Sequence, residues 1–462
     1  MRIRYTAPLL ATVVTVVVLV AVFVNRGGTT PAPSLPDLPS AAAESPRPAV
    51  LNPLPSNAPA PVASSVANQL AGAARDPGLG AELDGEVLDP STGAVLWARG
   101  SDDPEPPAST TKLLTGTAAL LSLGPNARLA TTAVRSGDTV YLVGGGDVTL
   151  VATHTPAGVT TYPQPASLAQ LARQTAAALA TGALKRVRLA VDATAWTGPR
   201  LARGWSPSYV TEGDVAPPSA LELDEGRIDP ADPFAARSPT PALQTGQVFA
   251  TQLRHDGVRV RGSVTSGFAP SGATPLGSVS SPTVAELVQR MLTTSDDDLA
   301  EALGRAIALH DHQPADFAGA AAAVKARVVS VGVLAAAVSL YDTSGLSHHD
   351  RVSPQALVTV LRADVRNPIL SPVIEGLPIA GLTGTLAMRY RTLPASEAAG
   401  VVRAKTGTLT GVNTLAGEVV DRSGRLLVFA FLAPRAPLPS LTEAALDRLA
   451  ARLARCGCGV AS

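Results

Sequence analysis

The stretch Ser109-Thr110-Thr111-Lys112 is the most informative part of the sequence, because it places a serine and a lysine at the start of a predicted helix. It follows Pro106-Pro107, and apolar residues then recur at three- and four-residue spacing until Gly124-Pro125. This spacing predicts a helix with Ser109 at its N-terminus. Ser109 and Lys112 are three residues apart, so they lie one turn apart on one helix face. A neutral lysine there can take the serine proton, while backbone N–H groups face the oxygen charge that develops.

A second motif, Lys405-Thr406-Gly407-Thr408, lies at the start of a predicted strand near the other end of the chain. Its lysine supplies a cation for a substrate carboxylate, and its glycine lets a substrate backbone approach the strand edge closely. Each motif alone is common, since Ser-x-x-Lys is usually a capped helix with a solvated lysine and Lys-Thr-Gly is frequent in turns. Their order and their distance along the chain give the pair its weight.

The two motifs resemble those of the penicillin-binding and class A β-lactamase superfamily, whose signature is Ser-x-x-Lys, then Ser-x-Asn, then Lys-Thr-Gly. More narrowly, the chain resembles the D-alanyl-D-alanine carboxypeptidase/endopeptidase family of low-molecular-mass penicillin-binding proteins. These serine peptidases carry an extra domain between the first two motifs. The resemblance covers about residues 66–455, and the further segments that carry it are residues 142–147, 191–192, 204–205, 341–347 and 384–386.

The resemblance implies an α+β fold of the penicillin-binding/β-lactamase-like transpeptidase type, in which helices flank an antiparallel sheet and a β-rich domain is inserted. The sequence pattern agrees, because turn residues at 89–93 and 421–424 separate strand-like runs and predict hairpins. The expected parts are a membrane anchor or signal segment (1–27), a Pro/Ala-rich linker (28–64), a first catalytic part (65–130), the inserted domain (131–268) and a second catalytic part (269–462).

The middle motif departs from the family pattern. It reads Thr294-Ser295-Asp296-Asp297-Asp298, with Asp297 at the position where the family has asparagine. An asparagine amide both donates and accepts hydrogen bonds, whereas a carboxylate only accepts. A carboxylate close to Lys112 also favours the ammonium form of that lysine, which cannot act as a base. Activity could therefore be reduced, unless Asp297 is protonated or pairs with Lys405.

Carried over residue by residue, the resemblance implies a nucleophile, Ser109, a base, Lys112, and a proton relay to the leaving amine, Ser295. Backbone N–H groups of Ser109 and Thr408 would form the oxyanion hole, and two threonine hydroxyls would hold the terminal carboxylate. The implied catalytic positions are Ser109, Lys112, Ser295, Asp297 and Lys405. The implied substrate-binding residues are Thr406, Gly407 and Thr408.

The N-terminus indicates export. Arg2 and Arg4 precede an almost uninterrupted apolar run over residues 8–24, which is at the short end of what spans a roughly 30 Å hydrocarbon layer. Basic residues before the run favour keeping the N-terminus inside, so the rest of the chain would be extracytoplasmic. We expect an uncleaved membrane anchor, with a cleaved signal peptide as the alternative.

Composition argues against other classes of function. The 37 basic and 37 acidic residues cancel, so no net field favours nucleic acid. His310-Asp311-His312 and His348-His349-Asp350 each lack a third convergent ligand, so we expect no metal and no cofactor. Cys456 and Cys458 form no disulfide framework, and a bridge between residues this close would be strained, so we expect a structurally idle pair.

The resemblance therefore implies a serine D-alanyl-D-alanine carboxypeptidase/endopeptidase that acts on peptidoglycan stem peptides through an acyl-enzyme on Ser109. Such an enzyme is also acylated by β-lactam antibiotics. One alternative is a catalytically weakened peptidoglycan-binding or scaffolding homologue, because of Asp297. Another is a β-lactamase, which ranks lower because no glutamate in the sequence matches the one that some β-lactamases use to activate water.

Overall fold

The computed structural model describes residues 58–153 and 162–457. The anchor or signal segment expected over residues 1–27 lies outside the described residues. Among the described helices, none combines the length and the apolar character that crossing a bilayer requires.

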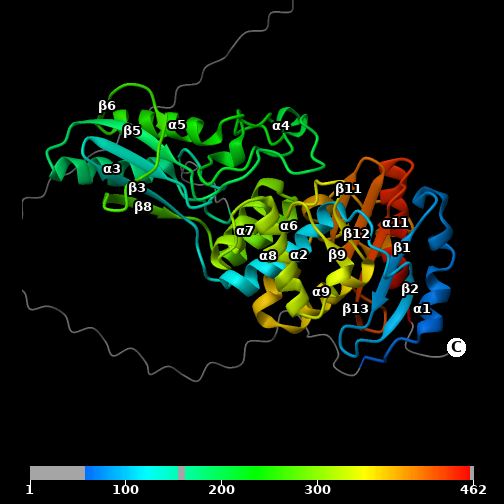
Figure 1. The fold of residues 1–462 in the computed structure, drawn as a ribbon. Helices are drawn as coiled ribbons and strands as arrows, with labels where there is room; N and C mark the ends of the chain where they lie inside the picture. The colour runs from blue at the N-terminus through cyan, green and yellow to red at the C-terminus, as the bar shows by residue number, and fades with distance from the viewer. Residues whose placement is uncertain (1–57, 154–161, 458–462) are drawn as a thin grey trace, which may run out of the picture. The chain divides into compact units, whose positions relative to one another are not determined.

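An antiparallel sheet of five strands forms the centre of the catalytic part (Figure 1). In spatial order the strands are β11 (Arg403–Leu409), β12 (Val412–Val420), β13 (Leu426–Ala433), β1 (Asp84–Leu88) and β2 (Val95–Arg99). Strands from the two ends of the described chain thus share one sheet, because β1 pairs with β13. The two hairpins predicted from the turn residues, β1–β2 and β12–β13, are both confirmed.

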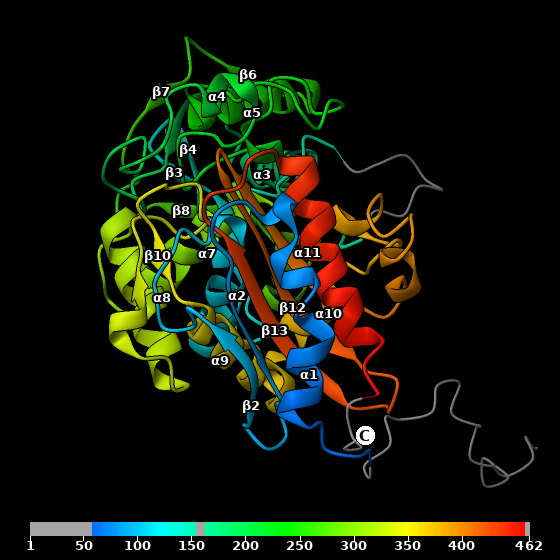
Figure 2. The same cartoon turned by 90° about the vertical axis from the view of Figure 1, so that its right-hand side faces the viewer.

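The sheet is buried on both faces, as alternate residues of β13 show. Phe429 and Phe431 face a hydrophobic cluster that includes Leu446 and Leu449. These leucines belong to α11 (Pro439–Ala454), which Figure 2 shows lying across the sheet beside α1 (Ala63–Leu70). The other face contributes to a second cluster, built largely from helices. Its members on β13 are Val428, Ala430 and Leu432.

The helices of this second cluster hold the nucleophile segment against the sheet. They are α2 (Thr111–Leu123), α6 (Val284–Thr294), α7 (Asp297–His310), α8 (Phe317–Ser330), α9 (Pro354–Arg366) and α10 (Ser371–Glu375). Helix α9 packs on β13 and β1, and α2 packs on α6, α7, α8 and α9. Helix α2 is therefore central and fully enclosed, with eleven of its thirteen residues buried. The helix predicted after Ser109 is confirmed as α2.

A second sheet, mixed in direction, forms the inserted part. Its strands are β3 (Ala130–Ser136), β4 (Thr139–Val143), β5 (Arg186–Asp192), β6 (Arg259–Val260), β7 (Thr265–Ser266) and β8 (Thr274–Ser280). Helices α3 (Leu168–Thr181) and α5 (Pro241–His255) share its hydrophobic cluster, and a short helix, α4 (Tyr209–Glu212), lies between them in sequence. Strand β8 lies beyond residue 268, yet it pairs along its length with β3.

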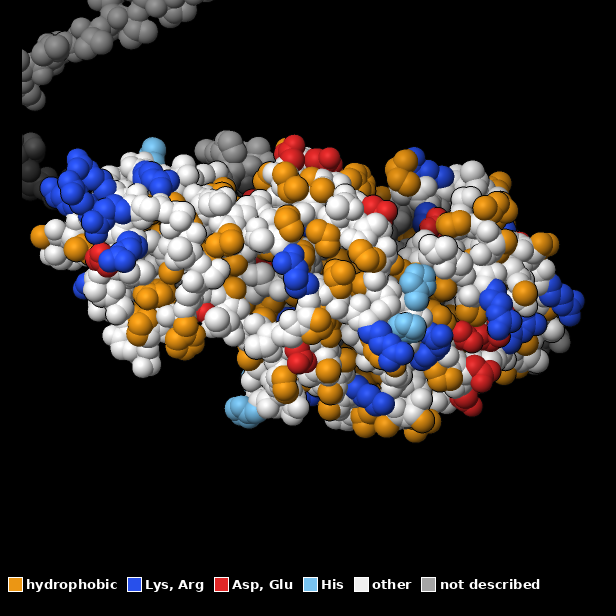
Figure 3. Space-filling model, turned by 45° about the horizontal axis from the view of Figure 1, so that its top comes forward, with side chains coloured by type: hydrophobic (Ala, Val, Ile, Leu, Met, Phe, Trp, Pro, Cys, Tyr) orange, Lys and Arg blue, Asp and Glu red, His pale blue; other side chains and the backbone are white. Residues whose placement is uncertain are grey.

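The β5–β6 side of this sheet is basic. Figure 3 shows Lys and Arg side chains gathered at this end of the inserted part. The exposed arginines there are Arg186, Arg188, Arg259 and Arg261. Charged side chains at the end strand of a sheet discourage pairing with a strand from another chain.

Two further short segments complete the described fold. Strands β9 (Val338–Ser339) and β10 (Arg351–Val352) form a small antiparallel pair that brackets residues 341–350. At the C-terminal end, Cys456 is buried and disulfide-bonded. The expectation of an idle cysteine pair is therefore wrong, because Cys456 packs in the hydrophobic cluster under α11 instead of lying in a solvated tail.

The aromatic pair in β13 tests the packing on the α11 side. Phe431 is 0% exposed and contacts Trp97 and Phe429 with ring centroids 5.9 and 5.2 Å away. We expect Phe431→Ala to lower the free energy of unfolding by about 3–5 kcal/mol, because it leaves a cavity in a rigid layer. The control Leu441→Ala, at a side chain 52% exposed, should change it by less than about 0.5 kcal/mol. Equal effects in urea unfolding would contradict this packing.

Candidate active site

Ser109 lies at the entrance to helix α2. It is the middle residue of a 3₁₀ turn, Ala108–Thr110, that leads directly into the helix. Ala108 has a φ of +47°, a region that residues with a side chain rarely adopt. Gly345 makes this turn possible, because a Cβ at Gly345 would lie 2.0 Å from the Ala108 carbonyl oxygen. Backbone strain next to a candidate nucleophile is typical of functional sites.

Lys112 is fully buried and uses all three of its N–H donors. Its Nζ donates to Ser109 Oγ at 3.0 Å, to Asp297 Oδ1 at 2.5 Å and to the Ser344 carbonyl oxygen at 2.8 Å. Three acceptors around one nitrogen match the three hydrogens of an ammonium group. The expected proximity of Lys112 and Asp297 is present in the fold.

Asp297 is the first residue of α7, and the preceding Asp296 caps this helix by accepting from the Leu299 N–H. Burial raises the pKa of the Asp297 carboxyl, and the adjacent Lys112 acts in the opposite direction. The short contact therefore joins an ammonium group to a carboxyl whose charged form is disfavoured by its surroundings.

Ser295 and Lys405 form the opposite side of the site. Lys405 Nζ donates to Ser295 Oγ at 2.8 Å and to the Thr406 carbonyl oxygen at 2.7 Å. Ser295 ends α6 in the left-handed region, with a φ of +61°, which turns its hydroxyl toward β11. Burial, and then the charge of Lys112, hold the pKa of Lys405 well below its usual range.

Strand β11 presents a free edge to this site. Ala404 N–H bonds outward to the Pro378 carbonyl oxygen at 3.0 Å, and alternation along the strand aims the N–H groups of Thr406 and Thr408 to the same side. The Thr406 hydroxyl lies 2.8 Å from that of Thr385, and Thr408 is exposed. A backbone arriving at this edge would meet two N–H groups and two threonine hydroxyls.

Gly407 has a packing reason that the sequence analysis did not give. A Cβ there would lie 2.1 Å from Thr414 Oγ1 and 2.9 Å from the Pro107 carbonyl oxygen. The glycine therefore lets β11 pass directly beside the turn that carries Ser109. The expected role in substrate approach remains a prediction.

A cavity of about 500 Å³ opens beside these groups. The α6–α7 region contributes Arg290, Ser295 and Asp297 to its wall, and the inserted part contributes Asp214, Phe234 and Arg237. The inserted part thus forms one side of the space that a ligand would occupy. Sequence reasoning left its role open, because these residues belong to loops without a recognisable motif.

The segment 341–347 supports Lys112 from behind, and the sequence analysis gave it no role. Glu301 Oε1 accepts from the N–H groups of Thr343 and Ser344, each at 2.9 Å, and Arg305 donates to Glu301 Oε2 at 2.8 Å. These bonds fix the Ser344 carbonyl that accepts from Lys112. Glu301 and Asp297 are four residues apart on α7. One face of this helix therefore positions two of the three acceptors of Lys112, which are Asp297 itself and, through Glu301, the Ser344 carbonyl.

A buried pair of carboxyl groups holds the same segment at its other end. Asp342 accepts from the Gly345 and Ser347 N–H groups at 2.7 Å each and from Trp205 Nε1 at 2.6 Å. Asp350 accepts from the Tyr341 N–H at 2.7 Å, and it lies close enough to Asp342 for the two carboxyl groups to interact. Burial and the charge of Asp342 raise the pKa of Asp350 well above its usual range, and burial raises that of Asp342 to about 6.

Comparisons with known proteins agree with this arrangement. The model of the D-Ala-D-Ala carboxypeptidase 3 (S13) family matches residues 66–232 and 231–453. A carboxypeptidase DacB of Mycolicibacterium smegmatis is 39% identical over 457 residues, covering 97% of this chain and 96% of the relative. A carboxypeptidase of Mycobacterium tuberculosis is also 39% identical, covering 88% of this chain and 87% of the relative.

Among solved structures, penicillin-binding protein 4 of Haemophilus influenzae has the same fold. The superposition has a TM-score of 0.67 at 21% identity, and it covers 85% of this chain and 98% of that one. The α+β fold expected from the sequence is therefore confirmed, with a five-stranded antiparallel sheet flanked by helices and interrupted by an inserted part.

The Asp342–Asp350 pair predicts a pH dependence of stability. The folded state holds protons that unfolded aspartates release near pH 4, so the contribution of the pair is greatest below about pH 4 and is lost as pH rises through the raised folded pKa values. In Asp350→Asn the amide cannot ionise. Between about pH 5 and pH 8, the free energy of unfolding of this variant in urea should fall less than that of the wild type. A fall as steep as in the wild type would contradict the raised pKa of Asp350.

Proposed function

Because the chain belongs to the S13 family of D-Ala-D-Ala carboxypeptidases, we propose that it removes the terminal D-alanine from peptidoglycan stem peptides through an acyl-enzyme on Ser109. A β-lactam antibiotic would acylate the same serine. Residues 66–453 match the family model almost without interruption, so the proposal concerns nearly the whole described chain. The enzyme would act outside the cytoplasm, because its substrate is cell-wall peptide.

One observation carries the proposal: two lysine–serine contacts lie in one site. Lys112 Nζ is 3.0 Å from Ser109 Oγ, and Lys405 Nζ is 2.8 Å from Ser295 Oγ. The first pair supplies a nucleophile with a base, and the second supplies a hydroxyl with a proton source. An acyl transfer to serine needs both functions, one on each side of the scissile bond.

Acylation would proceed by attack of Ser109 Oγ on the carbonyl carbon of the penultimate D-alanine. The serine proton passes to Lys112, which must first be neutral. Burial that raises the pKa of Asp297 supports this step, because it weakens the stabilisation that the carboxylate gives to the ammonium form across the 2.5 Å contact. The C–N bond then breaks, and the leaving amine takes a proton through the Ser295 hydroxyl. Water later cleaves the ester on Ser109.

The free edge of β11 would hold the substrate. The N–H groups of Ser109 and Thr408 would stabilise the oxyanion, and the hydroxyls of Thr406 and Thr408 would hold the terminal carboxylate. Removing one such donor typically costs roughly 10²- to 10³-fold in rate. The lowered pKa of Lys405 does not prevent this lysine from acting as the proton source for Ser295, since a substrate carboxylate beside Lys405 would favour its charged form.

We also propose the limits of the parts. Pairing of β8 with β3 supports an inserted domain that extends to Ser280, beyond the expected end at 268. The apolar run over residues 8–24 supports attachment to the membrane through an N-terminal anchor, with a cleaved signal as the alternative.

A second candidate function is a peptidoglycan-binding protein with little turnover. The observation that favours it is the 2.5 Å contact between Lys112 and Asp297, which stabilises the ammonium form of the base. Under either candidate function the protein would bind stem peptides in the same way. The two differ in whether Ser109 is acylated fast enough for turnover.

Acylation by penicillin tests the nucleophile directly. We expect the purified full chain to gain the mass of one penicillin molecule, with peptide mapping placing the adduct on Ser109. Ser109→Ala should gain no mass, because Ser109 carries the hydroxyl that Lys112 contacts. A folded wild-type protein without an adduct would favour the binding candidate.

Asp297→Asn tests the proton balance. The amide cannot stabilise the ammonium form, so the second-order rate of penicillin acylation at neutral pH should rise roughly tenfold. Asp296→Asn is the matched control, because asparagine also caps a helix and Asp296 contacts the Leu299 N–H and Arg290 instead of Lys112. A slower reaction in Asp297→Asn alone would show that the carboxylate itself is required.

A further inference from the structure

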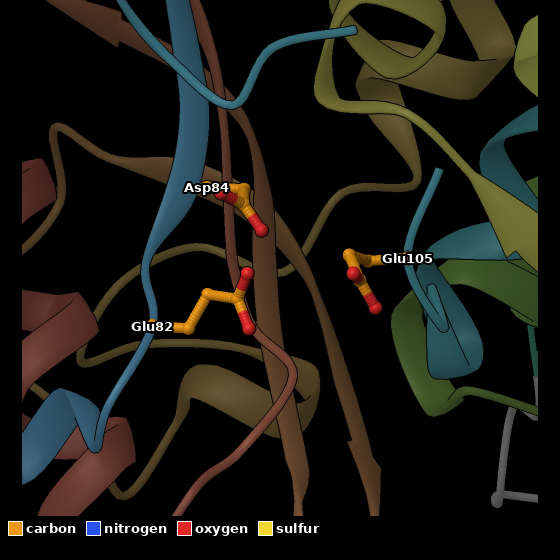
Figure 4. A group of neighbouring side chains, drawn as sticks. All are labelled: Glu82, Asp84 and Glu105. Atoms are coloured by element: carbon orange, nitrogen blue, oxygen red, sulfur yellow. The ribbon is translucent and has the colours of Figure 1, made fainter. Parts of the chain in front are cut away.

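Three carboxylates outside the catalytic site converge beside strand β1. Glu82 precedes the strand, Asp84 is its first residue, and Glu105 belongs to the segment that leads to Ser109. One oxygen from each lies within 4.8 Å of the other two. Figure 4 shows the carboxyl groups of Glu82 and Asp84 pointing toward each other, with Glu105 facing them from the opposite segment.

Asp84 is the group that calls for a ligand. It is only 5% exposed, and its Oδ2 is buried without a hydrogen-bond partner among the described residues. Leaving a buried carboxylate oxygen unpaired costs on the order of several kcal/mol, so such atoms normally face a donor, a proton or a cation. The cationic side chains nearby do not satisfy it. Arg435 pairs with Glu82 at 3.1 Å from a 70% exposed side chain, and Arg99 donates to the Ala74 carbonyl oxygen.

A second acidic group in the fold shows the contrast. Its carboxylates, on Glu225, Asp296 and Asp298, also lie within 4.8 Å of one another. There each one faces an arginine of the structure. The pairs are Glu225 with Arg227 and Arg290, Asp296 with Arg290, and Asp298 with Arg237. That cluster is neutralised by protein, whereas Asp84 is not.

We infer that Glu82, Asp84 and Glu105 form a binding site for a divalent, oxygen-preferring cation, with Ca²⁺ as its ligand. Calcium takes carboxylate oxygens at roughly 2.3–2.6 Å, so two ligands on opposite sides of one ion are about 5 Å apart. Oxygens that all lie within 4.8 Å of one another can therefore share one such ion. Magnesium, at roughly 2.0–2.1 Å, requires a tighter set. Glu82 and Glu105 are half-buried, which leaves room for water to complete the coordination.

Protons compete with the cation at this site. Burial, and then the charges of Glu82 and Glu105, raise the pKa of Asp84 to about 6. Arg99 and Arg351 lower the negative potential around the cluster, while the nearby Asp103 adds to it.

The cation would fasten the segment that carries the nucleophile. Glu105 pairs with Val352 through both its N–H and its carbonyl, at 3.3 and 3.0 Å. Two residues later, the Pro107 carbonyl accepts from Thr414 Oγ1 at 2.9 Å, and Ser109 follows. A cation bridging Glu105 to β1 therefore fixes the start of this segment against the sheet. This last step rests on the proposed function of Ser109, and cation binding itself does not.

The test uses the purified full chain, stripped with a chelator and then titrated with CaCl₂. We expect the unfolding temperature to rise by roughly 3–8 °C at about a hundredfold excess over Kd. NaCl at matched ionic strength should leave it unchanged, since a site of three carboxylates requires a compact divalent charge. No shift with calcium, or an equal shift with NaCl, would overturn the inference.

Asp84→Asn gives a signed result. The calcium-dependent shift should disappear, and the metal-free variant should unfold at a higher temperature than the metal-free wild type, because one buried, unpaired carboxylate is gone. Asp103→Asn, at an exposed acid next to the cluster, is the control and should keep the shift. A calcium shift that persists in Asp84→Asn would place the ion elsewhere and overturn the site.

Ser109→Ala separates this inference from the proposed function. The variant should retain the full calcium shift, because Ser109 contributes no ligand. The reaction of Ser109 with penicillin is measured on the wild type without calcium. If no adduct forms, the proposed function fails, and the result of the calcium titration is unaffected. Loss of the calcium shift in Ser109→Ala would contradict a site built from Glu82, Asp84 and Glu105.

Discussion

The buried ammonium group of Lys112 is the constraint on which the catalytic part depends. An ion of this kind loses several kcal/mol of hydration, and the fold must return that energy through well-placed acceptors. Three different elements supply them: the turn before α2 supplies Ser109, the start of α7 supplies Asp297, and segment 341–347 supplies the Ser344 carbonyl. Removing any one of these elements leaves one N–H of the buried ammonium group without an acceptor, so the same contacts specify both the chemistry and the packing.

The surroundings of the lysine are themselves fixed by buried polar groups. Glu301, held by Arg305, binds the backbone of Thr343 and Ser344, while Asp342 binds that of Gly345 and accepts from the Trp205 side chain. Trp205 belongs to the inserted part, so the insert contributes both to the cavity and to the support behind it. A network in which each member has a partner holds a loop more rigidly than apolar packing alone.

Local sequence predicts local features of this protein well. Ser109 and Lys112 were identified because three-residue spacing on a helix is readable without tertiary structure, and both predicted hairpins follow from their turn residues. The proximity of Asp297 to Lys112 followed from the motif position. The roles of the Ser344 carbonyl and of Glu301 were not predicted, because a backbone acceptor has no side-chain signature. Strand β8 was left outside the insert because its partner β3 is distant in sequence.

The cluster at Glu82, Asp84 and Glu105 shows the same limit, and it departs from the expectation of no metal. Its members match no ligand spacing in sequence, since the fold brings a strand start and a distant loop together. Histidines, which attracted attention as possible ligands, lie elsewhere: His310 is exposed and pairs with Asp311. The sequence therefore shows the motif-based site and conceals the one that only tertiary structure assembles.

The proposed function requires that Ser109 still turns over substrate while Lys112 is paired with Asp297. Release of free D-alanine from a stem pentapeptide by the full chain measures this most directly, with Ser109→Ala as the blank. We expect the wild type to release more than one D-alanine per protein molecule, and we expect Ser109→Ala to release none. Binding of the pentapeptide without release of D-alanine above the blank would contradict it.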